Sequence, residues 1–477
     1  MITKKEIDEK AKELQIHTSN IQRDYLFGWF LHYIFTHSTL KETLFLKGGN
    51  ALRKGYFVET RFSSDLDFGM PDDIDRSQLE NEIDAVCEFV SQNAGINFVN
   101  ERNSVEEKFN KWNEPRWQVF EVKIYFKSFY GEDDHITLKI SLDVTRFDKT
   151  YLPIQNIPLL HPYSDSENVK TTLRCMKLEE VLATKLKCML QREHAPDLFD
   201  FVYGVLLNKD IHIDKSEVRS VFLQRTIFES NPSMAKRILL KLPLEYLKGT
   251  WAKTIVYTEN KLINVDEAIS SFTQEITGLF SDVPDESHND HLYFGPEIRN
   301  IILKAGRTFT LLRITYDNAE RLVEPYSLKF LEKKDGTARE YLYVWDRVGS
   351  KNNPGIKMFV ADKIQSLENT EEVFSLREGQ EVELCRAGEY PEKKYLYDKD
   401  KHETRELEKY YRQTNKRPRV LRRVASRVST FGPTYIYQCS NCGKKIYRKK
   451  QSSTLKSHKS KSGFQCYGYA IYGGMKY

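Results

Sequence analysis

The chain has 477 residues, of which 30% are charged, and a formal net charge of +5. This length predicts about two to four domains. The longest apolar stretch, residues 27–35, is far shorter than the roughly 20 residues of a membrane-spanning helix, and the charged N-terminus shows no signal peptide. We therefore expect a cytoplasmic protein with no membrane partner. The seven cysteines are an odd number in a long chain, which argues against a disulfide framework.

Charge is distributed unevenly along the chain. Residues 401–477 contain 19 Lys and Arg against three Asp and Glu, a balance of +16, whereas the remainder has a balance of −11. A basic tail on a mildly acidic body indicates a polyanionic partner, most simply nucleic acid. The other interpretation is a solvated, disordered tail.

Hydrophobic periodicity divides the first part of the chain into helices and strands. Helices are predicted within residues 1–36 (two helices) and at 51–56, 76–92, 178–190 and 197–207, and residues 217–282 are mainly helical. Strands are predicted at 64–68, 117–126 and 136–145, after a short apolar run at 44–47.

The pattern changes near residue 294. A helix is predicted at 297–305, followed by short strands at 310–316, 326–331, 340–345 and 357–360. The turn signals between these runs favour a small β barrel. Residues 391–430 are highly charged and are typical of a linker, and a last compact module begins near residue 432.

Residues 47–68 carry the most informative chemistry. Gly48 and Gly49 lie between a predicted strand and a helix, where they allow a close approach of the backbone to a phosphate. Asp65 and Asp67 are two residues apart on a strand, so both carboxylates project from one face, where their repulsion is costly without a cation. Asp143, on another apolar strand, could complete a three-carboxylate site for Mg²⁺ or Mn²⁺. The alternative is that the aspartates face solvent in a turn.

These residues resemble the AbiEii/AbiGii nucleotidyltransferase family, the toxins of type IV toxin–antitoxin and abortive-infection systems. The resemblance covers roughly residues 20–280, and the matching blocks are residues 48–52, 61–68, 178–186 and 197–200. It implies a DNA polymerase β-like core, with a mixed sheet and helices, that uses an NTP. The family has Arg-Asp where this chain has Pro196-Asp197.

The resemblance also implies residue roles. Gly48, Gly49 and Ser64 would bind the triphosphate, and Lys185 would reach it as a point charge. Asp65 and Asp67 would hold Mg²⁺, Asp143 would act on the attacking hydroxyl as a metal ligand or a base, and Asp197 would complete the pocket. Without the family, Lys185 would be interpreted as a surface lysine.

Residues 297–370 resemble a WYL domain, a small Sm-like barrel. The resemblance depends on residues 315–316, 321–326, 340–342, 357–359 and 362–364, and Glu340 stands at the position of the name-giving Trp. Arginines of that family often bind nucleic acid or a nucleotide. Here Lys357 and Lys363 keep the charge but lose the bidentate fork. The alternative is a scaffold barrel.

The C-terminal module contains four residues with the spacing of zinc ligands: Cys439, Cys442, His458 and Cys466, in the pattern C-x2-C-x15-H-x7-C. Four such ligands suit tetrahedral Zn²⁺, on which folding of a small module would depend. Arg448, Lys449 and Lys450 lie between the ligands among aromatic residues, as in a zinc ribbon that binds nucleic acid. The alternatives are a redox pair of cysteines and a solvated His458.

We therefore expect a multidomain α+β protein of five segments: a nucleotidyltransferase core (1–215), its helical extension (216–290), a WYL-like barrel (291–388), a charged linker (389–431) and a zinc-binding module (432–477). The expected function is metal-dependent transfer of a nucleoside monophosphate from an NTP to RNA, with the tRNA 3′ end favoured. Such a toxin would act in antiviral defence and would have a separately encoded antitoxin. The alternatives are a nucleic-acid-binding regulator with a silent transferase fold, or transfer onto a protein.

Overall fold

A computed structural model describes residues 2–108, 119–129, 136–191, 194–258, 261–332, 338–348, 354–375, 434–440, 445–448, 458–459, 465–466 and 470–476. The chain divides into two compact units, Met1–Asp400 and Lys401–Tyr477. None of the described helices is both long and apolar enough to cross a bilayer.

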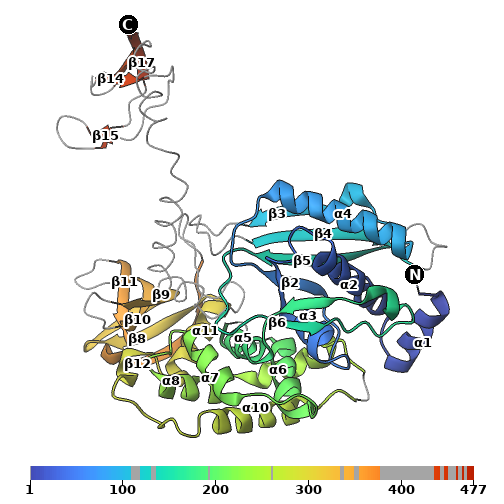
Figure 1. Ribbon diagram of the computed structural model, residues 1–477. Helices are drawn as coiled ribbons and strands as arrows, with labels where there is room; N and C mark the ends of the chain where they lie inside the picture. The colour runs from blue at the N-terminus through green and yellow to red at the C-terminus, as the bar shows by residue number, and fades with distance from the viewer. Residues whose placement is uncertain are drawn as a thin grey trace. The chain divides into compact units, whose positions relative to one another are not determined.

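The N-terminal part of the first unit is built on a seven-stranded sheet (Figure 1). Its order is β3-β4-β5-β2-β1-β7-β6. The strands are β1 (Phe45–Lys47), β2 (Asp65–Gly69), β3 (Ser104–Lys108), β4 (Val119–Lys127), β5 (Thr137–Thr145), β6 (Gln155–Pro158) and β7 (Thr172–Cys175). Strand β2 is parallel to β5 and β1 is parallel to β7, whereas the other neighbours are antiparallel. The sheet is therefore mixed, as the sequence predicted.

The two faces of this sheet differ because side chains alternate along a strand. Leu66 and Phe68 of β2 are fully buried, and Phe68 contacts Phe35 of α2 (Thr18–Thr36). Helix α2 also packs against α4 (Arg76–Ala94), so both helices cover the apolar face. Asp65 and Asp67 alternate with these apolar residues and therefore lie on the opposite face.

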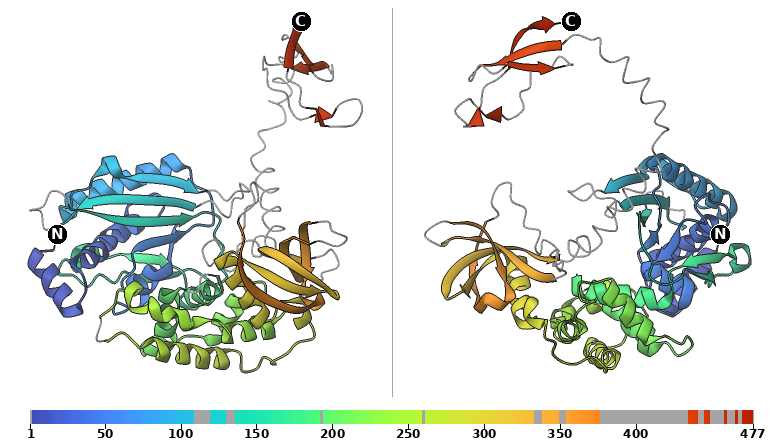
Figure 2. Two further views of the ribbon diagram at one scale, coloured as in Figure 1. Left: turned by 180° about the vertical axis from the view of Figure 1, so that it is seen from behind. Right: turned by 60° about the vertical axis from the view of Figure 1, so that its left-hand side comes forward.

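Helices follow the sheet along the chain (Figure 2). Their bounds are α5 (Leu178–Gln191), α6 (Ala195–Val202), the π-helical turn η5 (Tyr203–Leu207), α7 (Lys215–Gln224), α8 (Pro232–Leu240), α9 (Trp251–Thr254) and α10 (Val265–Leu279). Helix α5 packs against α6 and α7, and α10 packs against α6 and α8. The helical character predicted for residues 217–282 is confirmed. An additional helix, α1 (Lys4–Leu14), packs against α2.

A second sheet of five antiparallel strands follows α11 (Pro296–Thr308). The strands are β8 (Thr310–Tyr316), β9 (Ala319–Glu332), β10 (Ala338–Asp346), β11 (Gly355–Val360) and β12 (Ile364–Val373), in the order β11-β10-β9-β8-β12. Helix α11 packs against β8, β9 and β12. The sequence predicted four of these strands, as parts of a small barrel, but missed β12. Because β11 and β12 are the two ends of this strand order, closure into a barrel stays a prediction.

The second unit contains short strands in its described residues. Strands β14 (Lys445–Arg448), β13 (Thr434–Cys439) and β17 (Ala470–Lys476) form a sheet, and β15 (His458–Lys459) pairs with β16 (Gln465–Cys466). His458 and Cys466 are direct cross-strand partners in that pair. Cys442, Lys449, Lys450 and the predicted linker at 389–431 lie outside the described residues.

Candidate active site on the polar face of the first sheet

A row of charged residues crosses the polar face of the seven-stranded sheet. In direct register, Lys47 of β1 pairs with Asp67, Asp67 with Asp143 of β5, Asp143 with Glu121 of β4, and Glu121 with Glu106 of β3. The predicted aspartates are thus brought together from strands far apart in the sequence. Within the described part of the chain, no ion pair joins Asp67 or Asp143 to a cation, whereas Glu121 pairs with Lys108 and Lys123.

The Gly48–Gly49 turn lies directly against this row. Gly48 has a φ of +68°, and a Cβ atom there would lie 2.0 Å from Oδ2 of Asp67. A Cβ atom on Gly49 would lie 2.6 Å from Oγ of Ser63 and 3.0 Å from a guanidinium nitrogen of Arg61. Any other residue would therefore clash at both positions. The glycines let the backbone between β1 and α3 (Gly48–Ala51) pass beside the carboxylates.

Short contacts also fix the start of β2. The Asn50 side-chain amide donates to the Asp65 carbonyl oxygen, and the Ser63 hydroxyl donates to Oδ1 of Asp65 at 3.1 Å. Ser64 is exposed. The hydroxyl that contacts Asp65 is therefore that of Ser63, and the role of Ser64 at the triphosphate stays a prediction.

The crowding of carboxylates perturbs their ionisation. Burial, followed by the charge of Asp65, raises the pKa of Asp67 to about 7, against the opposing effect of Lys47 and Lys185. Burial, Asp65 and Glu121 also raise the pKa of Asp143. The raised pKa values of Asp67 and Asp143 thus follow from burial and from the crowding of like charges, a combination that is frequent at functional sites.

A second, fully paired network lies beside this face. Nζ of Lys185, on α5, is 2.7 Å from Asp200 and 3.1 Å from Asp197, both on α6. Asp200 also accepts two hydrogen bonds from Arg61, at 2.7 and 2.8 Å. Although burial alone would lower it, the two aspartates raise the pKa of Lys185, which is therefore a cation. Lys185 is only 6% exposed, so its interpretation as a surface lysine is wrong.

The sequence did not single out Arg61, Asp200, Glu121 or Lys47. Arg61 and Asp200 are 139 residues apart, and only the fold joins them. One available signal was the spacing of Asp197 and Asp200, because residues three apart share a helix face.

The donor set suits a hard divalent cation, which this nucleotidyltransferase-like arrangement implies. Among the described residues, no group of three or more His, Cys, Asp or Glu side chains could by itself hold a metal ion. Asp65 and Asp67 supply carboxylate oxygens, and the raised pKa of Asp67 marks uncompensated negative charge. Mg²⁺ is commonly bound by one or two carboxylates together with substrate phosphates. The residues therefore fit Mg²⁺ or Mn²⁺ if a nucleotide contributes further oxygen atoms.

The remaining predicted residues lie elsewhere. Lys357 is partly buried on β11, and Lys363 is exposed and paired with Asp317 at 3.1 Å. Cys439 is buried at the end of β13. His458, Cys466 and Arg448 lie on short strands, as given above.

Comparisons with known proteins agree with the predicted family. The family described as nucleotidyl transferase AbiEii toxin, type IV TA system, matches residues 29–286, more than half of the chain. One similar solved structure is MenT4, the nucleotidyltransferase toxin Rv2826c from Mycobacterium tuberculosis H37Rv. It is 16% identical, with a TM-score of 0.39, over 60% of this chain and 91% of that chain. No curated protein sequence matches the chain significantly.

Proposed function

Because the chain belongs to the AbiEii family of nucleotidyltransferase toxins of type IV toxin–antitoxin systems, we propose that it transfers a nucleoside monophosphate from an NTP to RNA. The tRNA 3′ end is the favoured acceptor. The observation that supports this proposal is the close approach of the Gly48–Gly49 turn to Asp67, where burial and the neighbouring Asp65 raise the pKa of the Asp67 carboxyl.

In this proposal the turn and the cations beside it bind the triphosphate. The backbone amides of Gly48 and Gly49 would donate to phosphate oxygens, and Ser64, which directly precedes β2, would add a hydroxyl. Lys185 provides positive charge that Asp197 and Asp200 hold in a defined position. Arg61 lies against Gly49 and adds a second cation. Such preorganised charge stabilises a phosphoryl-transfer transition state.

The carboxylates act at the reacting centre. Asp65 and Asp67, together with phosphate oxygens of the NTP, would hold Mg²⁺ or Mn²⁺, which supplies activation of the attacking hydroxyl and neutralisation of the pyrophosphate leaving group. Asp143 lies next to Asp67 on the parallel strand, on the side away from Lys47. From this position Asp143 would orient the acceptor 3′-hydroxyl and accept its proton, and its raised pKa suits that role.

The rest of the chain would bind the acceptor. Lys357 and Lys363 of a WYL-like barrel, and Arg448, Lys449 and Lys450 of the tail, would contact nucleic-acid phosphates. Cys439, Cys442, His458 and Cys466 would bind one Zn²⁺, and the cross-strand pairing of His458 with Cys466 supports this set. Purified protein should then contain one zinc per chain, and Cys439→Ser should lose it. Unchanged zinc content in that variant would contradict the ligand set.

The transfer reaction itself can be tested with each of the four α-labelled NTPs, Mg²⁺, total RNA and total protein. Wild type is compared with Asp65→Asn and with Asp72→Asn, which changes an exposed aspartate nearby. We expect label on a discrete RNA band for wild type and Asp72→Asn but not for Asp65→Asn. Label on protein would instead favour a protein acceptor. Nucleic-acid binding without transfer would favour a regulator with a silent fold. A separately encoded antitoxin should suppress the label.

A further inference from the structure

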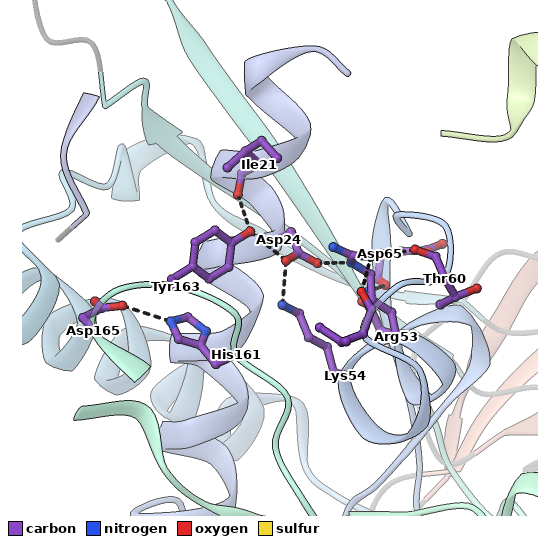
Figure 3. Close-up of polar contacts among 11 residues, drawn as sticks. Ile21, Asp24, Arg53, Lys54, Thr60, Asp65, His161, Tyr163 and Asp165 are labelled. Carbon is purple, nitrogen blue, oxygen red and sulfur yellow. Dashed lines mark hydrogen bonds and ion pairs between the residues drawn. The ribbon is translucent and has the colours of Figure 1, made fainter. Parts of the chain in front are cut away.

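A buried charged cluster, which includes Arg53 and Lys54 shortly after the Gly48–Gly49 turn in the sequence, is not used by the proposed chemistry (Figure 3). Its centre is Asp24 of α2, which is 2% exposed. The Asp24 carboxylate accepts hydrogen bonds from Arg53 at 2.6 Å, Lys54 at 2.8 Å and the Tyr163 hydroxyl at 2.7 Å. Two cations thus share one carboxylate in the protein interior.

Arg53 also contacts the loop that precedes β2. Its guanidinium donates to the carbonyl oxygens of Val58 at 3.1 Å and Thr60 at 2.6 Å, and it lies 3.5 Å from the ring centroid of Phe62. Figure 3 shows Arg53 between Asp24 and Thr60. Arg53 therefore fixes the course of the chain over residues 58–62, shortly before Asp65.

The same arginine is close in sequence to the phosphate-binding turn. It belongs to η1 (Leu52–Tyr56), a π-helical turn that continues α3 directly after Gly48 and Gly49. Single π-helical turns occur frequently at functional sites. Asn50 provides a second link between the same two segments, because its side chain donates to the Asp65 carbonyl. Arg53 thus joins the segment that starts with the turn to the segment that ends at the first aspartate.

Electrostatics explain why this arginine stays in place. Burial would raise the pKa of Asp24, but Arg53 and Lys54 outweigh it and hold that pKa well below its usual range. The Arg53 guanidinium forms an ion pair with this ionised carboxylate, which α2 holds in place. A buried ion pair is weak evidence for stability, since well-packed apolar residues often replace one without loss. A geometric role therefore explains this cluster better than a contribution to stability.

We propose that Arg53, anchored by Asp24, is a positioning residue that sets the spacing between the Gly48–Gly49 turn and the Asp65–Asp67 strand. This inference rests on the proposed function, because that spacing determines where the triphosphate lies relative to the carboxylates. Within the part of the chain that the structure describes, Arg53 forms no hydrogen bond or ion pair with the Gly48–Gly49 turn or with Asp65 and Asp67. Its loss should weaken nucleotide binding and leave binding of the RNA acceptor unchanged.

Arg53→Met and Lys54→Met form a matched pair for the test. Each removes one buried cation and leaves Asp24 paired with the other, so both make the same change in buried charge. Only Arg53→Met loses the contacts with the Val58 and Thr60 carbonyls. Arg53→Lys keeps a cation near Asp24 but lacks the guanidinium that bonds Asp24 through Nε and both carbonyls through Nη1. KM for the NTP, KM for total RNA and kcat are measured for all three variants of the full chain.

We expect Arg53→Met to raise KM for the NTP about tenfold, Arg53→Lys to raise it by less, and Lys54→Met to change it less than twofold. KM for RNA should stay within twofold in all three variants. A purely structural role would instead reduce the active fraction, lowering kcat and leaving both KM values unchanged. Equal effects of Arg53→Met and Lys54→Met on the NTP would overturn the inference.

Hydrogen–deuterium exchange keeps the inference testable if a variant is unstable or if no transfer is detected. Peptides covering residues 48–62 should exchange faster in Arg53→Met than in Lys54→Met, whereas peptides covering β8 should not differ. Absence of transfer in wild type would contradict the proposed function alone. Equal exchange of residues 48–62 in the two variants would contradict the positioning role alone.

Discussion

The two sheets of the first unit differ in how their carboxylates are paired. In the five-stranded sheet, Glu324, Glu340 and Asp346 are at most 1% exposed, and each is paired with an arginine, namely Arg347, Arg299 and Arg321. In the seven-stranded sheet, Asp67 and Asp143 are neighbours on one face, and the described residues provide no cation in an ion pair with either.

This difference separates a structural use of charge from a chemical one. A paired buried carboxylate is part of the fold, and its removal leaves the partner cation uncompensated. Crowded carboxylates with raised pKa values destabilise the fold and indicate a site that binds a cation or moves a proton. We therefore expect substitutions of carboxylates in the first sheet to affect activity, and those in the second sheet to affect stability.

The largest effect should follow from Asp67→Asn. This change removes a carboxylate oxygen from the reacting centre without changing the shape of the side chain. Nucleotidyl transfer should fall on the order of 10³-fold, because preorganised charge at a transition state has effects of this size. Initial rates with labelled NTP measure the loss, and circular dichroism checks the fold. A variant that keeps more than a tenth of the wild-type rate would remove the basis for the assigned site.

Glu340→Gln tests the structural role of a paired carboxylate in the five-stranded sheet. Glu340 pairs with Arg299 and accepts from the backbone N–H of Phe294 at 2.8 Å. Loss of its charge leaves Arg299 buried beside a neutral group, so the free energy of unfolding should fall by about 3–5 kcal/mol. Urea unfolding measures this change. Glu320→Gln, at an exposed position of the same sheet, is the control and should cost less than about 1 kcal/mol.

The activity of the folded fraction of Glu340→Gln should stay within about twofold of wild type, because Glu340 lies on the other sheet. A specific loss of transfer in a variant with normal stability would show that the second sheet takes part in the chemistry.

Asp200→Asn should have an intermediate effect. Asp200 is the common partner of Lys185 and Arg61, so its neutralisation leaves both cations less well positioned. Substitution of such supporting residues typically costs about 10–100-fold in activity. Asp210→Asn, at an exposed turn nearby, controls for the loss of a surface carboxylate. Full activity in Asp200→Asn would exclude a role for this network in transfer.

The smallest effect is a pH dependence of stability in the metal-free protein. The pKa of Asp67 is raised from 3.8 to about 7 on folding, so the folded state binds the proton more tightly than the unfolded state. The free energy of unfolding should therefore fall as pH rises from about 4 to about 7. Asp67→Asn cannot acquire this charge. Its Tm in EDTA should depend less on pH and exceed that of wild type at pH 7.5.

The opposite slope, or identical slopes in the two proteins, would show that Asp67 is not the group that titrates. Addition of Mg²⁺ with an NTP should raise the Tm of wild type at pH 7.5 more than that of Asp67→Asn, because only wild type keeps the carboxylate.

Much of the first sheet and the place of its aspartates could be predicted from the sequence. Strand alternation placed Asp65 and Asp67 on one face of a strand, and the glycine pair indicated a close backbone approach. The predicted helices and strands of the core are present with small shifts of their ends, as at β2 and β5. The short strands β3, β6 and β7 were missed because four or five residues carry too little periodic signal.

The sequence by itself determined the local features: the polar and apolar faces of each strand, the turn before α3 and the family to which residues 29–286 belong. These features depend on periodicity and residue type over a few neighbouring positions, so the sequence is enough to predict them. Tertiary structure alone decided which distant charges meet. The register that places Asp143 beside Asp67, and the packing that joins Arg61 to Asp200 and Arg53 to Asp24, depend on contacts across tens of residues. Such contacts form when apolar faces are buried together, and no local pattern encodes them.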